Sequence, residues 1–226
     1  MTDGSLAKDL SSVLGLRDCS IDEALRHLDS RLGREGSESH SRLRVLSDSG
    51  WALQGGETAT RVFTVAGTAS DRVTLILKTC VSSAMGSSAS TMEAWLSRRR
   101  LIDEAGVATP SLYAVSGGTI LEDFIDHNLW TFLRDRPDKE CESVVKSLAR
   151  LSLGLDDLGF NLISAHDFRS DGERAVMIDF GSDLGQPNRP VMRSSREAIV
   201  REIDRLPSVA NGMIRNLFAG FYNEFA

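Results

Sequence analysis

Three features of the sequence combine residue types and placements that suit phosphate and metal chemistry. The first is the pair Gly55 and Gly56, which falls between two predicted strands in the segment QGGETATRVFTV. Paired glycines let the backbone approach a ligand closely and direct N–H groups at anionic oxygens. A glycine pair before a strand is equally a common hairpin turn, so this feature alone leaves both interpretations open.

The second feature is a lysine inside an apolar strand. Lys78 directly follows Leu75, Ile76 and Leu77, and alternation puts it on the same strand face as Ile76. An unpaired ammonium inside a protein is costly, so a buried Lys78 requires a carboxylate partner. Glu93, at the start of the next predicted helix, is the best candidate. The alternative is that Lys78 faces solvent at the end of its strand.

The third feature is the segment MIDFG at 177–181. It places Asp179 at the end of an apolar strand and two residues before Gly181. A carboxylate at a strand exit suits Mg²⁺, which prefers oxygen ligands and usually keeps substrate phosphates in its coordination shell. Because Asp-Phe-Gly also occurs by chance, the order of the three features carries more weight than any one of them.

Hydrophobic periodicity predicts the elements that position these residues in the first half of the chain. Apolar residues at helical spacing indicate a helix before a polar linker, and period-two segments then indicate strands. In chain order we expect a helix at 20–33, strands at 43–53, 59–67 and 71–79, a helix at about 91–105, and strands at 111–115 and 119–125. The first three strands are expected to form an antiparallel meander.

The second half is mainly helical by the same criteria. We expect helices at 129–133 and 138–157, a short β pair at 166–169 and 174–180, and helices at 194–206 and 211–225. The whole order predicts an α+β protein with two lobes. The expected division is an N-terminal extension and linker at 1–44, an N-lobe at 45–126 and a C-lobe at 127–226.

The order of these features resembles that of the protein-kinase-like superfamily, in its aminoglycoside phosphotransferase and choline kinase branch. The segment GGETATRVFTV is similar to that branch's nucleotide loop, RRRLIDEAGVATPSLYAV to its helix C, turn and fourth strand, and TILEDFIDHNLWTFL to its hinge. The resemblance covers about residues 45–185. It implies a bilobal kinase-like fold with a five-stranded antiparallel N-lobe and a small helical C-lobe.

The resemblance also implies ATP and Mg²⁺ as cofactors and gives individual residues their roles. Lys78 would hold the α- and β-phosphates, Glu93 would orient Lys78, and Asp179 would bind Mg²⁺. Leu121 and Glu122 would stand at the adenine-facing position of the hinge. Gly55 and Gly56 would belong to the nucleotide loop.

The catalytic loop departs from the family pattern HGDxxxxN or HRDxxxxN. Placing GFN of this chain over HGD puts Asn161 at the position of the base, and His166 or Asp167, one residue of register apart, at that of the metal-binding asparagine. A neutral amide has no useful basicity, whereas Asp167 can bind Mg²⁺. Asp156 and Asp157, expected to be solvated at the end of the preceding helix, are reserve candidates for the base.

Composition narrows the function classes. The chain has 226 residues, 41% of them hydrophobic, which excludes intrinsic disorder. A net charge of −6 excludes the broad basic footprint of a non-specific nucleic-acid binder. The one basic run, at 98–100, is expected to be a solvated helix face. No apolar run approaches the roughly 20 residues of a membrane span and no secretion signal begins the chain, so we expect a cytoplasmic protein without membrane contact.

These observations favour an ATP- and Mg²⁺-dependent phosphotransferase. Only 45 residues follow Gly181, so the acceptor site is expected to be small or borrowed, which favours a protein acceptor or a partner-bound substrate. Two alternatives stay open because the base is missing. One is a pseudokinase that acts as a binding module, and the other is transfer of a nucleotidyl group from the same site.

Overall fold

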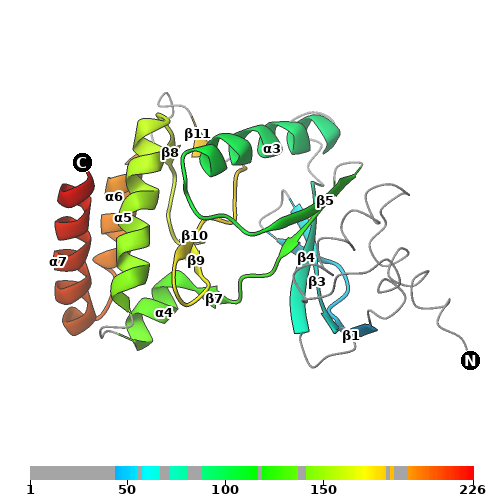
Figure 1. Cartoon of the computed structure of the whole chain (residues 1–226), viewed down its shortest axis with the longest axis horizontal. Coiled ribbons are helices and arrows are strands. Elements are labelled where there is room, and N and C mark those ends of the chain that lie inside the picture. Colours follow the sequence, from blue (N-terminus) through cyan, green and yellow to red (C-terminus); the bar gives the residue numbers. More distant parts are fainter. Residues whose placement is uncertain are drawn as a thin grey trace, which may run out of the picture. The chain divides into compact units, whose positions relative to one another are not determined.

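The computed structural model in Figure 1 describes most of the chain after its first 43 residues. The described residues are 44–54, 58–66, 72–80, 88–116, 119–136, 141–181, 184–185 and 193–226. The predicted helix at 20–33, together with Gly55 and Gly56, lies outside them.

The chain divides into two compact units. The N-terminal unit comprises residues 1–94 and 111–124, and the C-terminal unit comprises residues 95–110 and 125–226. The sequence led us to expect an extension and linker at 1–44, an N-lobe at 45–126 and a C-lobe at 127–226. The division differs because residues 95–110 make their contacts with the C-terminal part of the chain.

The N-terminal unit is built on an antiparallel sheet with the strand order β1-β3-β4-β6-β5, and β2 pairs with β3. The strands are β1 (Arg44–Asp48), β2 (Ala52–Gln54), β3 (Thr58–Ala66), β4 (Arg72–Cys80), β5 (Leu112–Ser116) and β6 (Thr119–Asp123). This confirms the five predicted strands and their antiparallel arrangement. The predicted first strand is divided into β1 and β2, because Gly50 turns the chain with a φ of 68°.

The register of β4 sorts its side chains between two faces. Lys78 stands opposite Ile120 of β6, and Ile76 stands opposite Glu122, so all four side chains lie on one face. The other face carries the apolar core of the sheet, which includes Phe63, Leu75, Leu77 and Leu121, each at most 1% exposed. Alternation in the sequence therefore places Lys78 on the face opposite this apolar layer.

The C-terminal unit combines helices with two small antiparallel sheets, ordered β10-β9-β7 and β11-β8-β12. The remaining elements are α3 (Ser88–Glu104, shared with the N-terminal unit), β7 (His127–Asn128), α4 (Leu129–Asp135), α5 (Cys141–Asp157), β8 (Asn161–Leu162), β9 (Arg169–Ser170), β10 (Ala175–Val176), β11 (Leu184–Gly185), β12 (Arg193–Ser194), α6 (Ser195–Ile203) and α7 (Ser208–Phe225). No helix within the described segments is long and apolar enough to cross a bilayer.

The centre of the C-terminal unit is α5, which lies beside α7 in Figure 1. Val144, Leu148, Leu151 and Leu155 recur at helical spacing and are at most 1% exposed, as the sequence pattern predicted. Gly154 also faces a neighbour closely, since a Cβ at this position would lie 2.8 Å from a methyl carbon of Val107. This close packing fixes the segment before β5 against α5.

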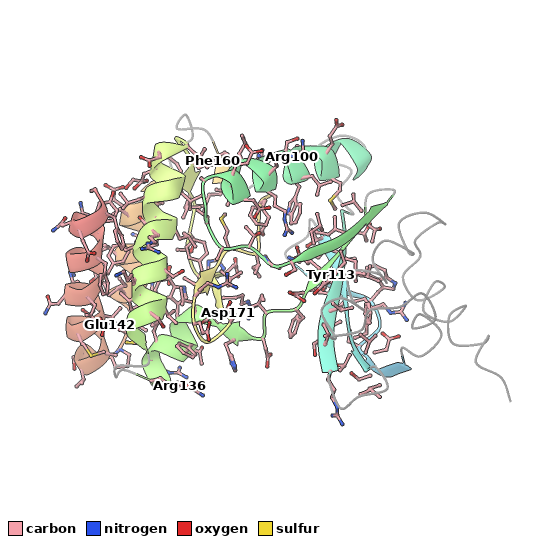
Figure 2. The ribbon with its side chains drawn as sticks, in the orientation of Figure 1. Arg100, Tyr113, Arg136, Glu142, Phe160 and Asp171 are labelled. Carbon is pink, nitrogen blue, oxygen red and sulfur yellow. The ribbon has the colours of Figure 1, made fainter. Side chains whose placement is uncertain are left out.

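The predicted hairpin near 170 forms, but it is shorter than expected. Within the predicted hairpin only Arg169–Ser170 of β9 and Ala175–Val176 of β10 pair, and the segment after Val176 has no ladder partner in the two small sheets. The Asp171 carboxylate accepts hydrogen bonds from the backbone N–H groups of Glu173 and Arg174, and Gly172 has a φ of 96°. Asp171, labelled in Figure 2, therefore stabilises the turn. The two strands that the turn joins are two residues long each.

Candidate functional site

Two aspartates that the sequence singled out line one small cavity in the C-terminal unit. Asp167 and Asp179 border this cavity together with Ser164, and its other walls are apolar, from Leu162, Phe168, Met177 and Leu184. Its volume is about 10 Å³. A polar cavity of about 10–15 Å³ is the size that holds one water molecule. The two predicted metal ligands therefore border the same cavity, which is large enough for one water molecule or ion.

Asp179 lies in a loop whose backbone is held at several points. Its Oδ1 atom accepts a hydrogen bond of 2.8 Å from the N–H of Gly181. Before it, the N–H of Met177 donates to the carbonyl of Ala108 at 3.0 Å. The Asp179 side chain itself is exposed and forms no ion pair within the described part of the chain.

The C-terminal part of α3 packs on this loop. The Arg98 guanidinium donates to the carbonyls of Phe180 and Gly181, at 3.2 and 2.5 Å. The Phe180 ring is buried and meets the Trp95 ring edge to face, with 4.8 Å between centroids. These contacts fix the backbone on either side of Asp179, so its carboxylate projects from a supported loop.

The basic run at 98–100 is therefore not a solvated face, and that prediction was wrong for two of its three arginines. Arg99 is 3% exposed, and its guanidinium donates to the carbonyl of Pro110 and lies over the rings of Trp95 and Phe180. The reason is helical spacing, because Arg99 follows the buried Trp95 by four residues. Only Arg100, labelled in Figure 2, is exposed as expected.

His166 and Asp167 are joined to Ser164 by a chain of polar contacts. The Nε2 atom of His166 is 3.0 Å from Oδ2 of Asp167, and its Nδ1 atom is 2.6 Å from Oγ of Ser164. His166 is exposed and does not line the cavity, whereas half-buried Asp167 does. Of the two register choices, Asp167 is the one that shares a cavity with Asp179.

Sequence reasoning missed Ser164. Its Oγ atom accepts a hydrogen bond from the N–H of His166 at 3.2 Å and donates to Oε1 of Glu202 at 3.4 Å. A serine two residues before a histidine is the pattern of a local side-chain turn, which was the available signal. Its position at the cavity depends on tertiary packing, and no hydrophobic periodicity in the sequence predicts it.

Asn161, predicted at the position of the base, is not among the residues that line the cavity. It belongs to β8, the central strand of the second small sheet, where it stands opposite Gly185 and Ser194. The two aspartates are thus grouped without Asn161.

The reserve candidates at the end of α5 have different environments. Asp156 is half-buried and accepts hydrogen bonds from the N–H and Oγ of Ser195, at 3.1 and 2.6 Å, and from the Tyr222 hydroxyl at 3.2 Å. The expectation that it is solvated was wrong, because Asp156 caps the start of α6. Burial, together with the Asp156 charge, raises the pKa of Tyr222. Asp157 is exposed, as expected.

In the N-terminal unit, Lys78 forms an ion pair with Glu122, with 2.5 Å between Nζ and Oε1. Only 11% of the lysine side chain and none of the glutamate side chain is exposed. The expected pair with Glu93 was wrong, because Glu93 is on the exposed side of α3 and makes no ion pair within the described ranges. Glu122 lies on the neighbouring strand and the same sheet face as Lys78.

The hinge residues are both enclosed by the sheet. Leu121 is fully buried on the apolar face, and Glu122 is fully buried on the opposite face against Lys78. Their side chains therefore serve packing and charge pairing, and contacts of this segment with a ligand would have to come from its backbone.

The residues at the cavity could serve as ligands of a magnesium ion, but they are too few to enclose a metal with protein ligands alone. Among the described residues, no group of three or more histidine, cysteine, aspartate or glutamate side chains could hold a metal ion. Magnesium does not require such a cage, because one or two carboxylates commonly bind it while waters and substrate phosphates complete its shell. The pair Asp167 and Asp179 meets this lower requirement.

Comparison with known proteins adds no assignment to this geometry. No protein-family model matches the chain, and a search of curated proteins finds no match. The interpretation of the site therefore rests on its own residues.

Proposed function

We propose that this chain is a phosphotransferase that uses ATP and Mg²⁺ and transfers phosphate to a protein acceptor, in a kinase-like fold and in the cytoplasm. The observation that carries the proposal is the small cavity lined by both Asp167 and Asp179. When bound, ATP supplies the γ-phosphoryl group and Mg²⁺ neutralises charge on the phosphates.

The two aspartates would hold the ion through carboxylate oxygens. Asp179 is suited to this role because its loop is supported from both sides, through Arg98 and through Met177. Asp167 is suited because the His166 ring lies against one of its oxygens and orients the carboxylate. Preorganised ligands of this kind lose little freedom on binding, which favours a tight site.

Lys78 is the residue proposed to contact the phosphates. In the structure its side chain is almost enclosed and lies against the Glu122 carboxylate, which supplies the opposite charge. An ammonium has three donors, which lets one group hold a carboxylate and a phosphate together. Glu122 thus takes the orienting role that the sequence had given to Glu93.

The proposal predicts slow turnover. Asn161 cannot accept a proton, and Asp156 is engaged in capping α6. General base assistance contributes about 10²–10⁴-fold, while most of phosphoryl transfer depends on positioning and charge neutralisation. Loss of the base therefore slows the reaction without removing its main source of catalysis.

Nucleotide binding is tested by thermal unfolding with ATP and Mg²⁺. A ligand at 100 times its Kd stabilises a protein by about 2.7 kcal/mol. For a chain of this length that is about 5 to 10 °C in Tm. We expect the shift to need Mg²⁺, to fall in Asp167→Asn and Asp179→Asn, and to persist in Asp157→Asn, whose exposed carboxylate lies outside the cavity.

Product analysis separates the remaining alternatives. Release of ADP together with a phosphorylated acceptor supports phosphoryl transfer, whereas release of pyrophosphate with an AMP-modified acceptor shows nucleotidyl transfer. Nucleotide binding without either product supports the pseudokinase alternative. The absence of any Mg²⁺-dependent shift at millimolar ATP contradicts the proposal as a whole.

A further inference from the structure

A second pocket in the C-terminal unit is rich in arginine. It has a volume of about 870 Å³, and its lining includes Arg196, Arg201, Arg205 and Arg215 with only two carboxylates, Glu197 and Asp204. Four positive and two negative side chains give this lining a formal charge of +2, on a chain whose net charge is −6. We call it the arginine groove, and it shares no residue with the cavity of Asp167 and Asp179.

The groove follows from the amphipathic character of α6. Ala198, Ile199 and Ile203 are buried on one side of this helix, at most 2% exposed. Helical spacing then directs Arg196 and Arg201 away from the core. The Oγ atom of Ser194 caps the helix by accepting a hydrogen bond from the N–H of Glu197 at 3.2 Å.

Two of the four arginines are held by carboxylates. Arg205 forms an ion pair of 2.6 Å with Glu202, whose side chain is 7% exposed, and Arg215 of α7 pairs with Asp204. These pairs place both guanidinium groups near the end of α6, in the lining of the groove. The pair with Arg215 balances the charge of Asp204. Glu197 is then the one carboxylate of the lining without an ion pair in the described structure.

The other two arginines have no carboxylate partner among the residues that the structure describes. Arg196 lies over the ring of Tyr222, with 4.4 Å between its Cζ atom and the ring centroid, and Arg201 is exposed. A guanidinium presents a planar set of donors that matches a carboxylate in a bidentate manner. The stacking on Tyr222 orients Arg196 without consuming this capacity.

We propose that the arginine groove binds a short acidic segment of a polypeptide. That this polypeptide is the phosphate acceptor rests on the proposed function, whereas the binding itself does not. Arg196 and Arg201 are five residues apart, which is about 7.5 Å along the helix axis and about 140° around it. Their long side chains both border the groove, so one ligand can meet both guanidinium groups there. A flexible segment with carboxylates on separated residues can place one carboxylate on each arginine.

The charges around the groove favour a short peptide over a long polyanion. Glu197 lies between the two arginines in the sequence and also lines the groove, and the net charge of −6 repels a ligand with a continuous line of negative charge. A peptide with spaced carboxylates can place its charges on Arg196 and Arg201 and a neutral residue beside Glu197. The groove volume is also within the range of about 300–1,000 Å³ that is usual for ligand sites.

The test is fluorescence anisotropy with a labelled peptide of alternating glutamate and glycine, without ATP or Mg²⁺. We expect binding that weakens with salt and is absent for the matching glutamine peptide. Arg196→Glu and Arg201→Glu should each weaken it about tenfold or more, which corresponds to about 1.4 kcal/mol. The control is Arg100→Glu, which makes the same charge change at an exposed arginine of α3 and should leave the affinity within about twofold.

Three results would overturn the inference: no binding of the acidic peptide by the wild-type protein, an equal loss in Arg100→Glu, or tighter binding of a single-stranded oligonucleotide of equal charge. Circular dichroism of the variants verifies that each remains folded, as expected for exposed side chains. Because the assay contains no nucleotide, its outcome is separate from that of the proposed phosphotransferase. If both hold, Arg201→Glu should raise KM for an acidic protein acceptor and leave kcat unchanged.

Discussion

Two pairs of ionisable side chains, one in each unit, have opposite environments. In the sheet of the N-terminal unit, Lys78 and Glu122 face each other at 2.5 Å and are almost entirely enclosed. In the C-terminal unit, Asp179 is exposed and Asp167 is half-buried, and both border a small cavity. The first arrangement satisfies charge within the fold, and the second leaves carboxylate oxygens accessible to a ligand.

The difference follows from what supports each group. Lys78 lies opposite Thr60 on one neighbouring strand and Ile120 on the other, in the interior of the sheet. A charge at such a position is tolerated only with a partner of opposite sign. Asp179 is positioned through its backbone, by Arg98 on the next two carbonyls, so its carboxylate needs no oppositely charged partner for the loop to fold.

The largest effect is expected at the buried pair. In Lys78→Met the Glu122 carboxylate loses its counter-charge inside the sheet, which should lower the free energy of unfolding by about 3–5 kcal/mol. Glu122→Gln should be costly for the same reason. Urea denaturation followed by circular dichroism measures both. If either single variant is as stable as the wild type, the pair is not the structural element described above.

A double variant distinguishes charge from packing at this site. Replacing both partners by apolar residues of similar size, in Lys78→Met with Glu122→Leu, removes both desolvated charges at once. Buried ion pairs replaced in this manner are often neutral or stabilising, so the double variant should regain most of the stability lost in the single variant. A double variant with the summed loss of both single variants would show that the two residues act independently.

The next effect is expected at Arg99, a buried charge of the C-terminal unit. Its guanidinium donates to the carbonyl of Pro110 and packs against Trp95 and Phe180. Arg99→Leu should cost about 1.5–3 kcal/mol, the range for hydrogen bonds from charged donors. Arg100→Leu, one residue along and exposed, should stay within about 0.5 kcal/mol of the wild type. Equal losses in the two variants would contradict the burial of Arg99.

A smaller effect is expected at Asp156, where one carboxylate holds the first turn of α6 and the Tyr222 hydroxyl. Asp156→Ala removes this cap and should cost about 1 to 2 kcal/mol. Asp157→Ala, exposed on the same turn, is the control and should change stability little. Neither variant should alter the Mg²⁺-dependent Tm shift. Loss of that shift in Asp156→Ala would reveal a second role at the nucleotide site.

The sheet could be predicted from the sequence because its signals are local. Alternation of apolar and polar residues gave β3 and β4 nearly to the residue, and the apolar stripe of α5 was equally clear. The pair β8 and β12 was missed because two-residue strands have no measurable period. Their existence depends on which loops the helices bring together.

The candidate site was predictable in part, for a related reason. Asp179 could be singled out from its position at the end of an apolar strand, and Asp167, with His166 as the other register choice, from placing GFN over the HGD of the family pattern. The partner of Lys78 could not be found by the same reasoning, because Glu93 follows Lys78 by 15 residues and starts the next predicted helix, whereas Glu122 follows it by 44 residues in a later strand. The choice between them depends on strand register and on the direction in which α3 presents its faces, which appear only in three dimensions.

The smallest effect is expected at an ion pair on the surface of the N-terminal unit, which can be compared with the buried pair of the same unit. Asp48 and Arg61 form an ion pair at the edge of the sheet, and the hydrogen bond from the Arg61 side chain lowers the pKa of Asp48 from 3.8 to about 2. A lowered pKa in the folded state means that the pair contributes stability at pH values above about 4. That contribution disappears as the pH falls toward 2.

Because this pair is accessible to solvent, its contribution at neutral pH should be about 0.2–1 kcal/mol, far less than that of Lys78 and Glu122. We therefore expect Asp48→Asn to be slightly less stable than the wild type at pH 7 and equal to it at pH 2. Denaturation curves at a series of pH values measure the difference, and added salt should reduce it at pH 7. A difference that grows as the pH falls would reverse the predicted sign. A loss at pH 7 comparable to that of Lys78→Met would mean that exposure does not separate the two pairs.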